Sequence, residues 1–95
     1  MLEKHYMLVI KGTCGYCEKA IELLKENNLS FVYTDMDNAE KLLDITKEQV
    51  NWETVPIIWE QTLQWEENHA TVIENNFIGG YTELTESLGV IEEND

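Results

Sequence analysis

Two cysteines, Cys14 and Cys17, are the residues of this sequence best suited to covalent chemistry. They stand in a C-x-x-C arrangement, which places the two sulfur atoms one turn apart if a helix begins there. A deprotonated cysteine can attack a disulfide sulfur, and a second thiol nearby can then release the mixed disulfide. The spacing therefore predicts thiol–disulfide exchange, with Cys14 as the attacking residue and Cys17 as the resolving residue.

Other uses of a cysteine pair fit the sequence less well. A structural disulfide that closes so short a loop would add little stability. A zinc site needs further ligands, and the two histidines, His5 and His69, each stand apart from other candidate ligands. Burial without any reactivity would account for Cys17 alone better than it accounts for the spaced pair. We therefore predict a redox site and no metal site.

The residues around the pair indicate how it is positioned. An apolar run at residues 6–10 is typical of a buried strand. A helical pattern follows over residues 17–28, with Thr13 as the predicted N-cap and Cys14 in the first turn. Unpaired N–H groups at the helix start favour a thiolate at Cys14, and Lys11 adds positive charge nearby. Cys14 is therefore expected to be the more reactive cysteine.

The rest of the chain predicts a small α/β domain. Residues 31–33 form a second predicted strand, and Asp37 with Glu40 predicts the capped start of a helix over residues 38–49. Strand, helix and strand in this order indicate a βαβ unit with parallel pairing. The remaining predicted elements are a third strand over residues 55–59 that Pro56 opens, a fourth over residues 71–73 or 76–78, a helix over residues 82–88 that Gly89 ends, and a frayed acidic tail over residues 92–95.

Length and charge narrow the classes of function. The 95 residues, of which 43% are apolar, fit one globular domain over residues 1–95. Nineteen acidic side chains against six basic ones, all lysines, give a net charge of −13. Nucleic acids and anionic membranes are bound by clustered Lys and Arg, so this charge argues against both. With neither a membrane-spanning run nor a secretory leader in the sequence, we expect a cytoplasmic monomer.

Three motifs sharpen the prediction. They are Lys11-Gly12-Thr13-Cys14-Gly15-Tyr16-Cys17, Thr54-Val55-Pro56 and Gly79-Gly80-Tyr81-Thr82-Glu83. In this order, and over nearly the whole chain, they resemble the motifs of a dithiol glutaredoxin. The resemblance implies a thioredoxin fold, an α/β domain with a four-stranded mixed sheet flanked by about three helices. It also implies a glutathione-dependent oxidoreductase that reduces protein disulfides and glutathione mixed disulfides.

The resemblance also implies a set of site residues. Pro56 has a cis peptide bond beside the attacking cysteine, and Lys11 meets the glycyl carboxylate of glutathione. The Val55 backbone pairs with the cysteinyl residue, and the amides of Tyr81 and Thr82 hold the γ-glutamyl carboxylate. The implied glutathione-binding residues are Lys11, Tyr16, Thr54, Val55, Pro56, Gly80, Tyr81, Thr82 and Glu83. Glutathione is then a co-substrate with no permanently bound cofactor, and the partners are disulfide-containing clients, among which ribonucleotide reductase is usual in this family.

The sequence departs from the family pattern in several places. Glu83 stands where the family usually has aspartate, and Gly15 replaces a proline that many dithiol relatives carry. The 22 residues between Pro56 and Gly79 exceed the usual number. Because long loops without secondary structure are uncommon, the segment of residues 60–76 is either an elongated hairpin or a partner-binding insertion.

Three other functions stay open at this point. One is a redoxin that thioredoxin reductase recharges in place of glutathione. Another is a carrier in which two chains and two glutathiones hold a [2Fe–2S] cluster through Cys14, since thiolates ligate such clusters; Gly15 favours this reading and Cys17 disfavours it. The last is a non-catalytic interaction module built around residues 60–76.

Overall fold

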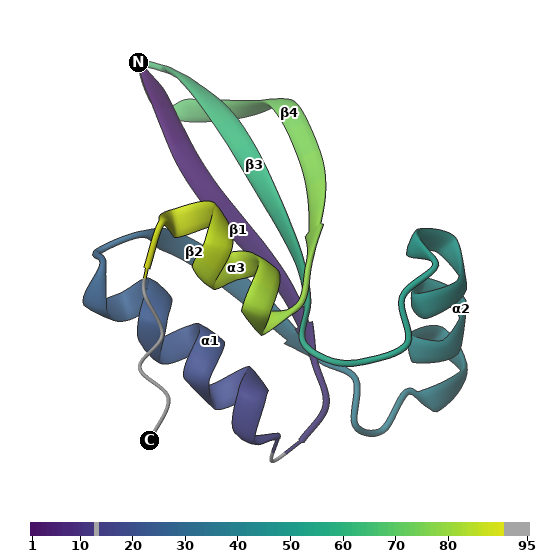
Figure 1. Cartoon of the computed structure of the whole chain (residues 1–95). Helices are drawn as coiled ribbons and strands as arrows, with labels where there is room; N and C mark the ends of the chain where they lie inside the picture. Colours follow the sequence, from purple (N-terminus) through teal and green to yellow (C-terminus); the bar gives the residue numbers. More distant parts are fainter. Residues whose placement is uncertain (13, 91–95) are drawn as a thin grey trace.

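The structure is a computed structural model that describes residues 1–12 and 14–90. Its elements in chain order are β1 (Leu2–Ile10), α1 (Gly15–Glu26), β2 (Ser30–Asp35), α2 (Glu40–Val50), β3 (Ile57–Glu66), β4 (His69–Gly79) and α3 (Tyr81–Leu88). Helices α1 and α3 lie in front of the sheet in Figure 1, and α2 lies to one side. The predicted N-cap Thr13 and the predicted acidic tail of residues 92–95 lie outside the described residues.

The four strands form one mixed sheet in the order β2-β1-β3-β4. Strands β1 and β2 are parallel, with Tyr6 opposite Phe31, as the βαβ pattern predicted. Strands β1 and β3 are antiparallel, and so are β3 and β4. The four-stranded mixed sheet with three helices that the sequence predicted is confirmed.

The core lies on both faces of β1 near its C-terminal end, which explains the continuous apolar run there. Leu8 packs with Leu24 of α1 and Leu84 of α3 on one face, and all three side chains have 0% exposure. On the other face, Val9 packs with Leu43 of α2. These two clusters fix the end of the sheet from which β1 leads into the cysteine motif.

Helix α1 follows from its apolar stripe, since its buried residues are Cys17, Ala20 and Leu24. The helix ends at Glu26, close to the predicted end. Cys14 is the N-cap and not a residue of the first turn, because its backbone is extended, with φ −114° and ψ 123°. This correction places the Cys14 sulfur at the very start of the helix.

The predicted capping box of α2 is wrong. The helix begins at Glu40 with Ala39 as its N-cap, and no side chain caps it. The backbone N–H of Asp37 instead donates to the carboxylate of Asp35 at 2.9 Å, and the N–H of Gly12 donates to the same oxygen at 3.0 Å. The acidic side chain before this helix therefore organises the loop after β1.

Residues 60–76 form an elongated hairpin, because β3 and β4 continue through the whole segment. The single strand β4 replaces the two alternative fourth strands that the sequence suggested. Pro56 directly precedes β3, and the hairpin turns at Glu67, whose φ is +55°. Every residue of β4 from His69 to Asn76 is exposed.

Helix α3 ends as the sequence predicted, with Gly89 in the left-handed conformation at φ +69°. It packs on the same side of the sheet as α1, and the start of α3 lies near the start of α1 in Figure 1. No helix among the described residues is long and apolar enough to cross a membrane.

Candidate active site

Cys14 is held where β1 ends and α1 begins. Its sulfur accepts a hydrogen bond from the backbone N–H of Cys17 at 3.4 Å. The same sulfur lies 3.9 Å from the carbonyl oxygen of Val55, to which its thiol can donate. The side chain is partly exposed. Because the sulfur is partly exposed at the start of a helix, a disulfide in solution can reach it.

Cys17 lies one turn further into α1 and is 1% exposed. Burial raises the pKa of the Cys17 thiol to about 12, and its hydrogen bond with Cys14 acts in the same direction. Cys17 is therefore protonated at neutral pH. An outside disulfide reaches Cys14 first, and Cys17 can act only from within the protein on a bond that Cys14 has made.

The loop before β3 forms a second wall of the site. The peptide bond between Val55 and Pro56 is cis, as the resemblance implied. Pro56 is fully buried, whereas Thr54 is exposed. The Val55 carbonyl is turned to the Cys14 sulfur, so the backbone of this loop borders the reacting atom.

The third wall is the start of α3. Gly80 is its N-cap, and the Gly80 N–H donates to the Glu83 carboxylate at 2.9 Å. A Cβ atom on Gly79 would lie 2.8 Å from the Cγ of Glu83, and the Gly79 φ of +119° also favours glycine. The backbone N–H groups of the first turn, including those of Tyr81 and Thr82, have no helical partner. The start of α3 thus offers donors suited to a carboxylate.

These walls enclose an open cleft of about 350 Å³. Its lining residues are Tyr16, Trp52, Thr54, Val55, Pro56, Gly80, Tyr81, Thr82 and Glu83. The structure thus brings together eight of the nine residues that the resemblance assigned to glutathione. They come from α1, the loop before β3 and the start of α3, which are far apart in the sequence.

Lys11, the ninth of those residues, does not line the cleft. Its ammonium group lies 3.9 Å from the carboxylate of Glu40 at the start of α2, in a solvent-exposed ion pair. The loop that carries Lys11 reaches Cys14, but the lysine side chain turns to the other side of the sheet end, where α2 begins. In this structure the lysine is thus engaged by an acidic residue.

Trp52 is the cleft residue that the sequence prediction missed. It stands two residues before Thr54, outside any periodic pattern, and only its closeness to the Thr54-Val55-Pro56 motif could have indicated it. Its indole ring packs edge-on against Phe77, with ring centres 5.5 Å apart. Its Nε1 is buried and has no hydrogen-bond partner among the described residues.

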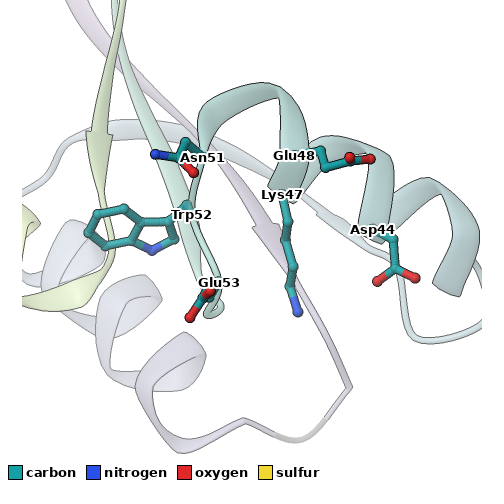
Figure 2. A pocket seen from close by; sticks show the side chains of 6 residues that line it. All are labelled: Asp44, Lys47, Glu48, Asn51, Trp52 and Glu53. Atoms are coloured by element: carbon teal, nitrogen blue, oxygen red, sulfur yellow. The ribbon is translucent and has the colours of Figure 1, made fainter.

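Trp52 also borders a second hollow of about 270 Å³, at the end of α2. Figure 2 shows its lining side chains, which are Asp44, Lys47, Glu48, Asn51, Trp52 and Glu53. Val55, whose carbonyl oxygen lies 3.9 Å from the Cys14 sulfur, lines the cleft and not this hollow, so the redox chemistry belongs to the cleft. Within residues 1–12 and 14–90, no group of three or more His, Cys, Asp or Glu side chains is placed to hold a metal ion.

The geometry provides what thiol–disulfide exchange requires. One cysteine is accessible at a helix start, a second thiol lies behind it, and a cleft beside them is lined by backbone donors and acceptors. The backbone N–H of Cys17 donates to the Cys14 sulfur, which keeps the residue that carries the resolving thiol beside the attacking sulfur.

The comparison with family models agrees with this chemistry. The glutaredoxin family model matches residues 6–62. The crystal structure of glutaredoxin 1 from Francisella tularensis, complexed with cacodylate, superposes with a TM-score of 0.62 at 24% identity, over 90% of this chain and 93% of that one. A thioredoxin from Plasmodium falciparum gives a TM-score of 0.49 at 18% identity, over 92% of this chain and 68% of that one. No curated protein sequence matches significantly. The chain thus has the thioredoxin fold and belongs to the glutaredoxin family of thiol–disulfide oxidoreductases.

Proposed function

We propose that this protein is a glutathione-dependent oxidoreductase that reduces glutathione mixed disulfides and protein disulfides. The observation that carries the proposal is the position of the Cys14 sulfur, 3.9 Å from the Val55 carbonyl oxygen at the edge of the cleft. A peptide thiol that lies along this cleft brings its own sulfur to Cys14. Its two ends then extend towards the start of α3 and towards the loop after β1.

The chemistry of glutathione fits the lining of the cleft. Its γ-glutamyl carboxylate suits the free N–H groups of Tyr81 and Thr82, because a helix start attracts anions. Its α-amino group is a cation, and Glu83 supplies a carboxylate beside that position. The Val55 backbone next to Pro56 can pair with the cysteinyl residue as an added strand does.

Reduction of a glutathione mixed disulfide needs Cys14 alone. The Cys14 thiolate attacks the sulfur of the glutathionyl group, an S–S bond to Cys14 forms, and the client leaves as a thiolate that takes up a proton. A second glutathione thiolate then attacks the Cys14-bound glutathione. Glutathione disulfide leaves and the Cys14 thiolate is restored. Each turnover therefore consumes one reduced glutathione, because the other half of the glutathione disulfide comes from the substrate.

Reduction of a protein disulfide needs both cysteines. Cys14 first forms a mixed disulfide with one client sulfur, and the other client sulfur leaves as a thiol. Cys17 then gives up its proton and attacks Cys14, which releases the second client thiol and leaves a Cys14–Cys17 disulfide. Two glutathione molecules reduce that disulfide. The cycle consumes reduced glutathione, which favours a cytoplasmic location.

The proposal is tested with the mixed disulfide of glutathione and 2-mercaptoethanol as substrate. Rates are compared with three electron donors: glutathione with glutathione reductase, cysteinylglycine at the same concentration, and thioredoxin reductase with NADPH. We expect saturable turnover with glutathione and a much lower rate with cysteinylglycine, which lacks the γ-glutamyl carboxylate. Equal rates with the two thiols, or turnover with thioredoxin reductase alone, would contradict the proposal.

A further inference from the structure

Lys19 lies against two aromatic side chains that line the cleft, Tyr16 and Tyr81. Its ammonium nitrogen is 5.4 Å from the centre of the Tyr16 ring and 5.9 Å from the centre of the Tyr81 ring. The two rings are tilted by 35° with centres 5.9 Å apart. Ammonium groups at such distances are attracted by the faces of aromatic rings. The lysine is thus held at the cleft mouth although it is exposed to solvent.

Three other lysines are placed differently. Lys11 is paired with Glu40, and Lys4 is paired with Glu60 at 3.1 Å on the far part of the sheet. Lys47 borders the separate hollow at the end of α2. In the described part of the chain, Lys19 is the lysine whose ammonium group lies against residues of the cleft.

The surroundings of Lys19 leave room for a ligand. A hollow of about 220 Å³ is lined by Gly15, Tyr16 and Lys19, on the α1 side of the cleft. A Cβ atom added to Gly15 would meet nothing within 4 Å, so the space beside the reactive cysteine is open. Tyr16 lines both this hollow and the cleft, so the two adjoin at this residue.

We propose that Lys19, held by Tyr16 and Tyr81, is a binding site for a carboxylate of the thiol or disulfide that reacts at Cys14. The chain carries a net charge of −13, which repels anionic substrates over long distances. A lysine fixed at the cleft mouth makes the potential there less negative, because the distant carboxylates are screened by salt and the nearby ammonium group is not. Its N–H donors stay available on the side away from the rings.

This inference rests on the proposed function for the identity of its substrate, but its first test does not. Iodoacetate and iodoacetamide both alkylate a thiolate and release iodide, and they differ in charge. The ratio of their rates at Cys14 therefore reports the local potential, because the thiolate fraction cancels. We expect K19Q to lower the iodoacetate-to-iodoacetamide ratio about threefold, as one unit charge several ångströms away in an aqueous setting does. The effect should shrink as salt is raised.

A matched control separates local from overall charge. K25Q makes the same change of net charge in the last turn of the same helix. We expect its ratio to equal that of the parent protein, and equal losses in K19Q and K25Q would overturn the proposal.

Two further variants separate charge from packing. K19R keeps the charge and the contact with the rings, so it should keep the parental ratio. K19M keeps only the apolar stem and should behave like K19Q. A parental ratio in K19M would show that the stem alone matters, and it would overturn the proposal. Circular dichroism of each variant establishes that the fold is kept.

The second test identifies the source of the carboxylate. Turnover of the glutathione mixed disulfide is measured with glutathione and with its diethyl ester, and K19Q should raise the KM for glutathione but not that for the ester. Peptide disulfides with an aspartate or an asparagine beside the cysteine test whether the carboxylate comes from a client protein. If the parent protein reduces the aspartate peptide faster than the asparagine peptide and K19Q does not, Lys19 also binds the carboxylates of acidic clients. If neither arm responds to K19Q, the proposal is wrong even when glutathione supports turnover.

Discussion

The two ends of the β3–β4 hairpin differ in burial and in what surrounds them. At the inner end, Ile57 and Ile58 are fully buried and the hairpin joins the Val55–Pro56 bond and Gly79. At the outer end, residues 69–76 of β4 are all exposed, and no helix covers them in Figure 1. The outer end is held by strand pairing, from Leu63 opposite Val72 to Glu66 opposite His69.

This difference indicates which end of the hairpin the chemistry depends on. The cleft is built where two helices begin and the hairpin starts, so its geometry is fixed by the buried inner end. The family match ends at residue 62, within β3, so it covers neither the outer hairpin nor the start of α3, and the distinction between them rests on burial. We therefore expect the outer hairpin to vary without consequence for catalysis.

Loss of the attacking sulfur is the largest effect that we expect. Cys14→Ser should reduce both activities to the uncatalysed background, because a hydroxyl at neutral pH is not a nucleophile towards disulfides. The control is Val72→Ser at the outer hairpin, which should keep full turnover of both substrates. The measurement is the glutathione-coupled rate with a mixed disulfide and with a protein disulfide. Residual turnover in Cys14→Ser would assign the chemistry to another group.

Loss of the resolving thiol should divide the two activities. Cys17→Ser should keep turnover of glutathione mixed disulfides, since that cycle uses Cys14 alone, and should lose reduction of protein disulfides. Mass spectrometry should find the client trapped on Cys14 in this variant. Equal loss of both activities would contradict the division of roles.

Much of this site could be predicted from the sequence, because its parts are local signals. The helical stripe that begins at Cys17 and the glycine pair before α3 are short motifs whose structure depends on neighbours in the chain. Trp52 was missed, since its packing against Phe77 of the distant strand β4 appears only in the folded chain. The early start of β1 at Leu2 was missed for the same reason, because Leu2 is in a strand only by pairing with Gln64.

The wrong prediction at α2 has a similar cause. Asp37 followed by Glu40 has the spacing of a capping box, but the pattern takes no account of competing partners. The Asp35 carboxylate binds the N–H groups of Gly12 and Asp37, and this fixes the loop in another conformation. Gly12 lies far from Asp35 in the sequence, so the competition appears only in the folded chain.

The same substitution at the two ends of the hairpin should change stability very differently. Ile58→Ala removes a side chain with 0% exposure and should lower the free energy of unfolding by about 2–5 kcal/mol. Ile73→Ala removes a side chain that is 47% exposed and should change it by less than about 0.5 kcal/mol. Urea unfolding followed by fluorescence measures both. Similar losses would show that the outer hairpin is covered in solution.

Alkaline pH should weaken the fold through a buried phenol. Burial, together with the hydrogen bond that Tyr6 donates to Glu60 at 2.9 Å, raises the pKa of Tyr6 from 10.0 to about 12. Above pH 10.0 the tyrosine ionises in the unfolded chain but not in the folded one, so stability is full below that pH and falls as pH rises towards 12. The expected slope from this residue is about 1.4 kcal/mol per pH unit.

Tyr6→Phe is the control for this slope. The variant loses the hydrogen bond to Glu60 and should be less stable at pH 8, but its stability should fall less steeply above pH 10.0. Cys17, whose pKa is also raised, contributes a slope that both proteins share. Parallel curves for the two proteins would show that Tyr6 does not titrate in this range.

The smallest expected effect lies at the tip of the hairpin. Glu67 has a φ of +55°, and the other non-glycine residues with positive φ are Asn28 and Asn51 in the described chain. Asparagine tolerates this conformation, whereas glutamate is strained in it. Glu67→Gly should therefore raise the free energy of unfolding by about 0.5–1 kcal/mol, because the relief of strain exceeds the added entropy of the unfolded chain.

This substitution also tests whether the hairpin tip is independent of the cleft. The strands transmit a change at Glu67 to Gly79 only through their pairing, and the exposed stretch of residues 69–76 lies between them. KM for glutathione and kcat should therefore equal those of the parent protein while the unfolding midpoint rises. A change in either constant would mean that the outer hairpin positions the start of α3, and the cleft would then depend on the whole length of the sheet.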